Sequence, residues 1–195
     1  MPSPLGHALA GVAIAWTAEA IRRQPMTVEP RFTLAGACLA LAVGPDLDFL
    51  YPPSHRMMTH SLAAGLCVGA TVWVLHRERR DGWIVALICA TAYGSHLLLD
   101  WLGGDTKLPA GLQLLWPFSR EWFISDIHLF RATDIGGMLK PRVMLSNAVA
   151  VLLEGLIVAP CAWAAYWWRR RAVSTAARSA EDWTAASRIS DNRRR

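Results

Sequence analysis

Histidines and aspartates are the residues of this sequence whose types and spacing could do chemistry. His96 and Asp100 are four residues apart in an otherwise apolar stretch, so on a helix they share one face, about 6 Å apart along its axis. Imidazole and carboxylate groups are the ligands of zinc, manganese and iron sites. Residues of the same two types recur where other apolar segments begin or end. The full set of candidate ligands is His7, Asp46, Asp48, His55, His60, His96 and Asp100. Four imidazoles and three carboxylates could hold one or two divalent ions, and we expect zinc, with manganese as the alternative.

Five apolar segments must position these residues. They are residues 5–21, 32–50, 59–76, 83–102 and 143–168. Each is about as long as an α-helix that crosses a bilayer. With 53% apolar and 18% charged residues, the chain is too apolar for an ordinary soluble domain. We therefore predict an all-α fold, a polytopic transmembrane helical bundle of about five spans. Gly44-Pro45 should bend or end the second helix, because proline lacks a backbone donor.

Arginines gather between or after these segments in three groups. They are Arg22, Arg23 and Arg31; Arg77, Arg79 and Arg80; and Arg169, Arg170 and Arg171. If all three groups are cytoplasmic, strict alternation puts the N-terminus outside and the C-terminus inside. All seven candidate ligands then lie at the outer face of the membrane. The net charge of +5 is explained by these flanking groups, so we expect membrane lipids as partners and no specific nucleic acid.

The composition divides the chain into two parts. Residues 1–168 form the expected membrane-embedded domain, and residues 169–195 form a basic, mobile cytoplasmic tail with few large apolar side chains. Ala18-Glu19-Ala20 could be the cleavage site of a signal peptide. No basic region precedes it, so we expect the first helix to be retained. Cleavage would remove His7 from the cluster.

Each candidate ligand also has a simpler interpretation. A single histidine at a membrane boundary is usually an interfacial residue, Asp46 could cap a turn, and Asp100 could pair with Arg56. The location of all seven at one face favours a metal site.

Four strings of the sequence, in this order, are similar to those of a known family. They are Gly44-Pro45-Asp46-Leu47-Asp48, His55-Arg56-Met57-Met58-Thr59-His60-Ser61, Ser95-His96-Leu97-Leu98-Leu99-Asp100 and Leu115-Trp116-Pro117-Phe118. With His7 near the start, this pattern resembles the YdjM-type family of inner-membrane metal-dependent hydrolases over roughly residues 1–168. The resemblance implies a multi-pass protein of the bacterial inner membrane with hydrolase activity. The stretch 103–111 departs from the pattern, so no site role is assigned to Asp105 or Thr106.

If the protein is an enzyme, a bound ion would activate water to attack an ester or phosphoester of a small or lipid substrate at the membrane surface. We expect Asp46 or His55 as a further ligand or general base, and Arg56 to offset charge on a phosphate group. The main alternative is a non-catalytic scaffold or regulator that its metal holds together. A transporter is less favoured, because the polar residues stop at one face.

Overall fold

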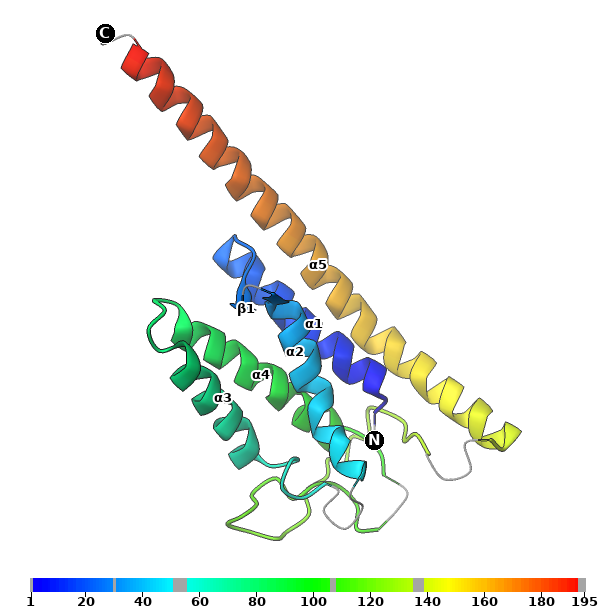
Figure 1. Ribbon diagram of the computed structural model, residues 1–195. Helices are drawn as coiled ribbons and strands as arrows, with labels where there is room; N and C mark the ends of the chain where they lie inside the picture. Colours follow the sequence, from blue (N-terminus) through cyan, green and yellow to red (C-terminus); the bar gives the residue numbers. More distant parts are fainter. Residues whose placement is uncertain (1, 30, 51–55, 106–107, 135–138, 193–195) are drawn as a thin grey trace.

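The computed structural model describes residues 2–29, 31–50, 56–105, 108–134 and 139–192, and it is mostly helical (Figure 1). Within these residues there are five α-helices: α1 (Pro4–Arg22), α2 (Leu34–Val43), α3 (Leu62–His76), α4 (Gly82–Trp101) and α5 (Pro141–Asn192). A 3-10 helix, η1 (Gly44–Leu50), continues α2. Strands β1 (Thr27–Glu29) and β2 (Phe32–Thr33) pair antiparallel in a small hairpin between α1 and α2. Each of the five predicted apolar segments thus overlaps one of these helices.

Local sequence signals set the ends of these helices. Ser3, Thr33 and Ser61 occupy the N-cap positions of α1, α2 and α3, and each side chain accepts a hydrogen bond from the backbone N–H three residues later. Such caps satisfy N–H groups that have no partner within the helix. The predicted break at Gly44-Pro45 is confirmed, because α2 ends at Val43 and the chain tightens into η1. The 3-10 turn lets Asp46 leave the axis of α2.

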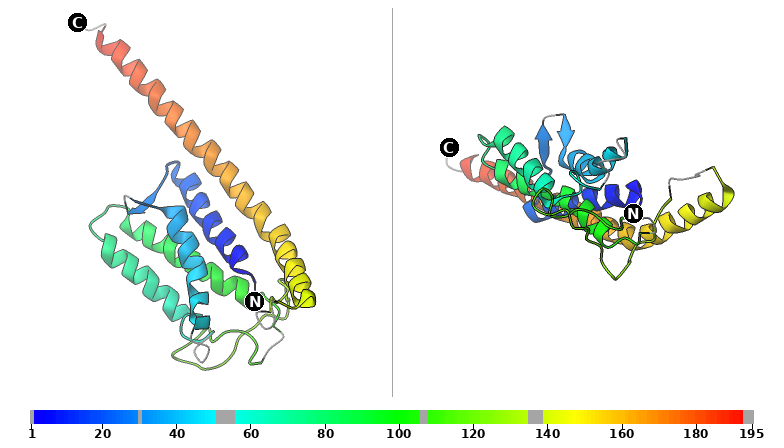
Figure 2. Two further views of the ribbon diagram at one scale, coloured as in Figure 1. Left: turned by 45° about the vertical axis from the view of Figure 1, so that its right-hand side comes forward. Right: turned by 90° about the horizontal axis from the view of Figure 1, so that it is seen from below.

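Successive helices α1 to α4 alternate in direction, so α1 begins at the same end of the molecule where α2 and α4 finish (Figures 1 and 2). The main core lies between α1, α2 and α4 and includes Ala15, Leu34, Cys38, Val85 and Cys89. The helices α1 and α2 approach closely at Gly11, where an added Cβ would lie 2.5 Å from the Cys38 carbonyl oxygen. Small residues permit such close approach.

Both ends of α1 are fastened to α5. At its start, Glu154 of α5 accepts hydrogen bonds from the Ser3 N–H at 2.9 Å and from the Ser3 hydroxyl at 2.5 Å. At its end, the buried carboxylate of Glu19 pairs with Arg169 and accepts from the Met26 N–H at 2.8 Å. Because these buried carboxylates bond both ends of α1, they prevent α1 from sliding along α5.

Only two of the described helices, α4 and the part of α5 from Pro141 to Glu181, are long and apolar enough to cross a membrane. With a rise of 1.5 Å per residue, α2 is about 15 Å long and α3 about 22 Å, against about 30 Å of hydrocarbon. The helix α1 carries His7 and Glu19 in its interior-facing positions. The five helices are therefore confirmed as helices, whereas the five-span bundle is not confirmed.

The last helix is longer than predicted, and the mobility expected for residues 169–195 stays a prediction. We predicted the fifth helix to end near Trp168, but α5 continues to Asn192 and extends past the other helices (Figure 1). Alanine and arginine are frequent after Trp168, and both residues favour helix. A helix that is already formed also extends without a new nucleation step.

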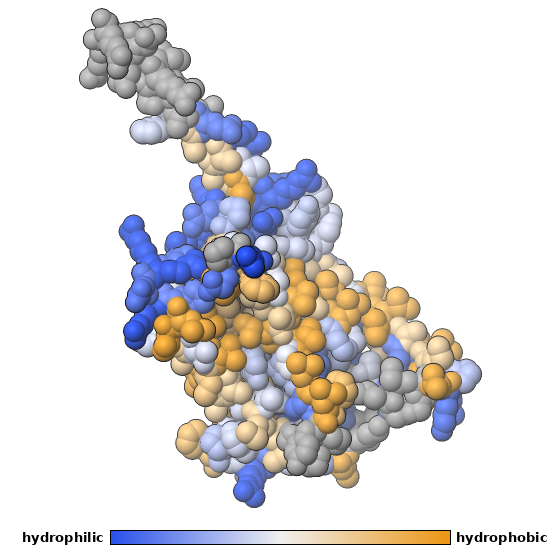
Figure 3. All heavy atoms as spheres, in the orientation of Figure 1, coloured by the Kyte–Doolittle hydropathy of each residue, from blue (hydrophilic) through white to orange (hydrophobic). Residues whose placement is uncertain are grey.

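Large apolar side chains are exposed along several helices. They include Leu66, Leu75, Leu87, Leu152 and Leu156, each more than half exposed. Figure 3 shows apolar residues gathered across the middle of one face, below a strongly hydrophilic region. Exposed apolar surface of this extent is typical of contact with lipid or with another protein.

Candidate metal centre

Four side chains converge where α2 and α4 end. Asp46 comes from η1, His60 from the connection that precedes α3, and His96 and Asp100 from α4. One possible ligand atom of each lies within 4.8 Å of the others. Three of the four residues are buried, and the Asp46 side chain is 18% exposed. The cluster thus joins three segments that lie far apart in the sequence.

The spacing of these atoms suits a single ion. The Nε2 atoms of His60 and His96 are 3.0 Å apart, and each lies 3.3 Å from Oδ2 of Asp100. Oδ1 of Asp46 lies 3.8 Å from the first nitrogen and 3.7 Å from the second. Tetrahedral zinc with bonds of about 2.1 Å separates its ligand atoms by about 3.4 Å. The distances among His60, His96 and Asp100 are close to this value, and Asp46 lies farther from both nitrogens.

The ring of His96 is oriented by the backbone. Its Nδ1 lies 2.8 Å from the carbonyl oxygen of Ala42, at the end of α2. A carbonyl oxygen can only accept, so Nδ1 carries the proton and donates it. In the neutral ring, the lone pair of Nε2 then faces the cluster, which is the arrangement that metal-binding histidines commonly show.

The ring of His60 is oriented by Asp48. Oδ2 of Asp48 lies 3.2 Å from Nδ1 of His60, and it also accepts hydrogen bonds from the Thr59 hydroxyl at 2.6 Å and the Arg56 N–H at 3.0 Å. Asp48, which we predicted as a metal ligand, is therefore placed against the nitrogen of His60 that faces away from the cluster. In this position a carboxylate fixes the ring and raises its basicity.

The charge of His60 depends on these carboxylates. Burial by itself lowers the pKa of the His60 imidazole. The carboxylates of Asp100, Asp46 and Asp48, which face the ring and stabilise its protonated form, outweigh burial and raise that pKa well above its ordinary value. The surroundings of His60 are therefore strongly negative and favour a cation.

His7 adds an imidazole to the cluster from α1. Its ring is fully buried and stacks on His96, with ring centroids 3.9 Å apart, and its Nε2 lies 3.4 Å from Oδ1 of Asp100. Neither nitrogen of His7 and neither carboxylate oxygen of Asp100 has a hydrogen bond of normal geometry to any residue that the structure describes. Buried polar atoms in this state are costly. A cation bound among them would satisfy these atoms.

Arg56 pairs with Asp105, which the sequence analysis left without a role. Oδ2 of Asp105 also accepts from the Gly111 N–H at 3.2 Å. A cavity of about 10 Å³, enough for about one water, is lined by Arg56, Asp100 and Asp105 among others. The pairing of Arg56 with Asp100 that we considered is replaced by this arrangement.

The structure thus brings Asp46, His60, His96 and Asp100 together, adds His7 beside Asp100, and places Asp48 behind His60. His55 and Thr106 lie outside the described residues. Sequence analysis missed Asp105 and Thr59. No periodic pattern marks either residue, and only the position of Thr59 beside His60 could have drawn attention to it.

Comparison with known proteins bears on the same part of the chain. The family model described as YdjM inner membrane protein matches residues 1–173, a range that includes every residue of the cluster. No curated protein and no solved structure matches the chain. Because the match covers most of the sequence, this chain is a member of the YdjM inner membrane protein family.

Proposed function

We propose that this protein is a membrane-bound metal-dependent hydrolase. The observation that carries the proposal is the cluster itself, in which two oriented imidazoles and the Asp100 carboxylate have nearly the spacing of ligands around one tetrahedral ion, with the Asp46 carboxylate beside them. His60, His96 and Asp100 would hold the ion. His7 and Asp46 lie close enough to complete the site or to hold part of a second ion. The nitrogen and oxygen donors suit zinc, and manganese is the alternative.

A divalent ion at this position would supply a Lewis acid and lower the pKa of a water molecule toward about 7. Residues of the chain would supply the general base and the contacts with the substrate. Asp46 is the most distant and the most exposed of the four, so it is suited either to complete the coordination or to accept a proton as general base. His55 stays a prediction for the same role. Asp105 holds the Arg56 guanidinium near Asp100, where it can bind a phosphate oxygen.

We further propose a multi-pass arrangement with the cluster at the outer face of the inner membrane. The alternating direction of α1 to α4 and the exposed apolar side chains of α3, α4 and α5 support this topology. The arginine groups at the opposite end from the cluster support a cytoplasmic position for that end. A periplasmic and a cytoplasmic reporter, each fused after Asn192, test it. Activity of the periplasmic reporter alone would overturn the topology.

The substrate we propose is an ester or phosphoester presented at the membrane surface, either of a lipid or of a small molecule. A cluster at the end of the helices, rather than at their middle, lies where a lipid headgroup would be reached. Arg56 favours the phosphoester of the two.

One observation favours the alternative, in which the ion only holds the helices together. Four protein atoms are available to a single ion, and the cavity beside Asp100 measures about 10 Å³. Structural metal sites are closed in this way, whereas catalytic sites keep one open position. In the hydrolase, a water molecule would take the place of Asp46, which lies farthest from the two histidines.

The experiment that tests the proposal measures metal content and hydrolysis on the same purified samples. His60→Ala and Asp100→Ala should lose about one or two equivalents of metal and all hydrolysis of lipid phosphoesters. The exposed His128→Ala variant is the control and should keep both. Metal that is retained by the wild type without any hydrolysis of esters or phosphoesters would favour the scaffold. Hydrolysis that survives in His60→Ala and Asp100→Ala would refute the proposal.

A further inference from the structure

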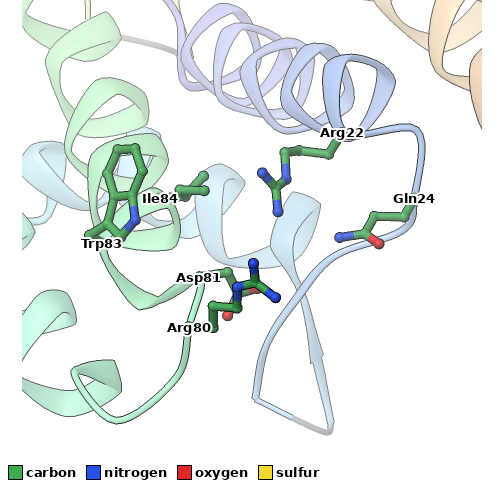
Figure 4. Close-up of a pocket in the computed structure, with 6 residues that line it drawn as sticks. All are labelled: Arg22, Gln24, Arg80, Asp81, Trp83 and Ile84. Atoms are coloured by element: carbon green, nitrogen blue, oxygen red, sulfur yellow. The ribbon is translucent and has the colours of Figure 1, made fainter.

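The end of the molecule opposite the metal centre has a cavity of about 450 Å³ between the end of α1 and the start of α4 (Figure 4). Its lining residues are Arg22, Gln24, Arg80, Asp81, Trp83 and Ile84. Figure 4 shows the side chains of Arg22, Arg80 and Gln24 directed into the same space from two different segments. Two positive charges therefore converge on one cavity.

These charges have no counterpart among the residues that the structure describes. Neither Arg22 nor Arg80 forms an ion pair with any residue inside the described ranges, and the one acidic residue of the cavity, Asp81, is bridged by Arg79 through both of its carboxylate oxygens at 3.2 and 3.3 Å. The cavity also opens at the N-terminus of the 20-residue helix α4, where the helix dipole favours an anion. The Gln24 amide adds a neutral donor. This combination favours a ligand with several anionic oxygens.

The aromatic and apolar lining indicates where this ligand comes from. Trp83 is 60% exposed at the rim, and Ile84 lies next to it in the first turn of α4. Tryptophan beside arginine at the end of a membrane helix is typical of the headgroup level of a bilayer. Basic pockets between helices on the cytoplasmic side bind lipid headgroups.

The same composition recurs on the other side of the α1 end. A second cavity of about 460 Å³ is lined by Arg23, Trp168 and Arg171, together with small and apolar residues of α1 and α5. Each cavity thus has two arginines and one tryptophan. Both lie at the level of the last turn of α1, as expected for two sites that face one leaflet.

We propose that the cavity between Arg22 and Arg80 binds the phosphate group of an anionic phospholipid of the leaflet opposite the metal centre. The two guanidinium groups hold the phosphate oxygens, Gln24 donates a further hydrogen bond, and Trp83 and Ile84 contact the glycerol and the start of the acyl chains. The site is independent of the proposed hydrolase, because its residues lie at the other end of α1 and α4 from the cluster.

Native mass spectrometry of the full chain in detergent, with added phosphatidylglycerol or phosphatidylcholine, tests this site. The wild type should retain phosphatidylglycerol in preference, and Arg22→Gln with Arg80→Gln should weaken its binding by about tenfold or more. The matched control, Arg31→Gln with Arg77→Gln, removes two exposed charges from the same end outside both cavities and should bind as the wild type does. Metal content should stay unchanged in all variants.

Three results would overturn the proposal. Equal binding by the wild type and the Arg22/Arg80 variant, or equal losses in both double variants, would show a diffuse attraction of charges and no site. Glycerol 3-phosphate is the probe for a soluble ligand. If it displaces phosphatidylglycerol at equal concentration, the cavity serves a free phosphomonoester instead of a lipid.

Discussion

Oδ2 of Asp48 lies 3.2 Å from Nδ1 of His60, on the side of the ring opposite the nitrogen that faces Asp100. The same oxygen accepts hydrogen bonds from the Thr59 hydroxyl and the Arg56 N–H. Asp48 and His60 therefore form a carboxylate–imidazole pair whose second ring nitrogen faces the cluster. This pair makes the effect of Asp48 on metal binding testable without removing a ligand.

Asp48→Asn should lower the affinity for zinc about 10- to 100-fold while leaving its stoichiometry unchanged, because the ring of His60 loses its orienting carboxylate. Competition with a chromogenic chelator measures the affinity. The exposed Asp126→Asn variant is the control for a lost negative charge. A lower stoichiometry in Asp48→Asn would instead show that Asp48 is itself a ligand.

Zinc binding should release protons and should weaken as the pH falls from about 8 to about 6. The carboxylates of Asp100, Asp46 and Asp48 raise the pKa of His60, so its imidazole holds a proton near neutral pH that the ion must displace. Titration calorimetry in two buffers of different ionisation enthalpy counts these protons. Identical heats in both buffers would contradict this prediction.

Gly11→Ala should destabilise the fold by about 1–3 kcal/mol, because the added Cβ would lie 2.5 Å from the Cys38 carbonyl oxygen and 2.7 Å from the Ala42 Cβ. Gly94→Ala in α4 is the matched control. Its Cβ meets no neighbouring element within 4 Å among the described residues, so it should be neutral or stabilise by about 0.5–1 kcal/mol. Thermal unfolding in detergent compares the two variants. If both shift the midpoint equally, α1 and α2 do not approach as closely as the structure places them.

Glu154→Ala should destabilise the start of α1 by about 1–3 kcal/mol, since the Ser3 N–H and hydroxyl lose their buried acceptor. Hydrogen exchange of the first turn of α1 and the unfolding midpoint report the change. The exposed Glu78→Ala variant should leave both unaltered. Equal exchange in the two variants would show that Glu154 does not hold this end of the helix.

Much of the helical framework could be predicted from the sequence, because long apolar segments and their caps are local signals. The break at Gly44-Pro45 followed from the chemistry of proline, and the position of Asp46 followed from the break. His96 and Asp100 were placed together by their spacing of four residues on α4.

Other features depend on geometry that one sequence does not encode locally. The tight 3-10 turn decides which of Asp46 and Asp48 reaches the metal cluster. It directs the two carboxylates to opposite nitrogens of His60, and only Asp46 lies on the cluster side. The ion pair of Asp105 with Arg56 depends on the course of an irregular loop, which has no periodic sequence pattern. The length of α5 was underestimated because its apolar content ends near Trp168, while its helix propensity does not.

The ligands of the cluster come from segments that tertiary folding alone brings together, and His60 and His96 are 36 residues apart. An ion bound there would close this stretch into a loop, much as a covalent cross-link does, and would restrict the unfolded chain accordingly. Unlike a disulfide, this cross-link would be reversible through chelation. The supply of metal in the cell would then set how long newly made chains remain folded, whatever reaction the centre carries out.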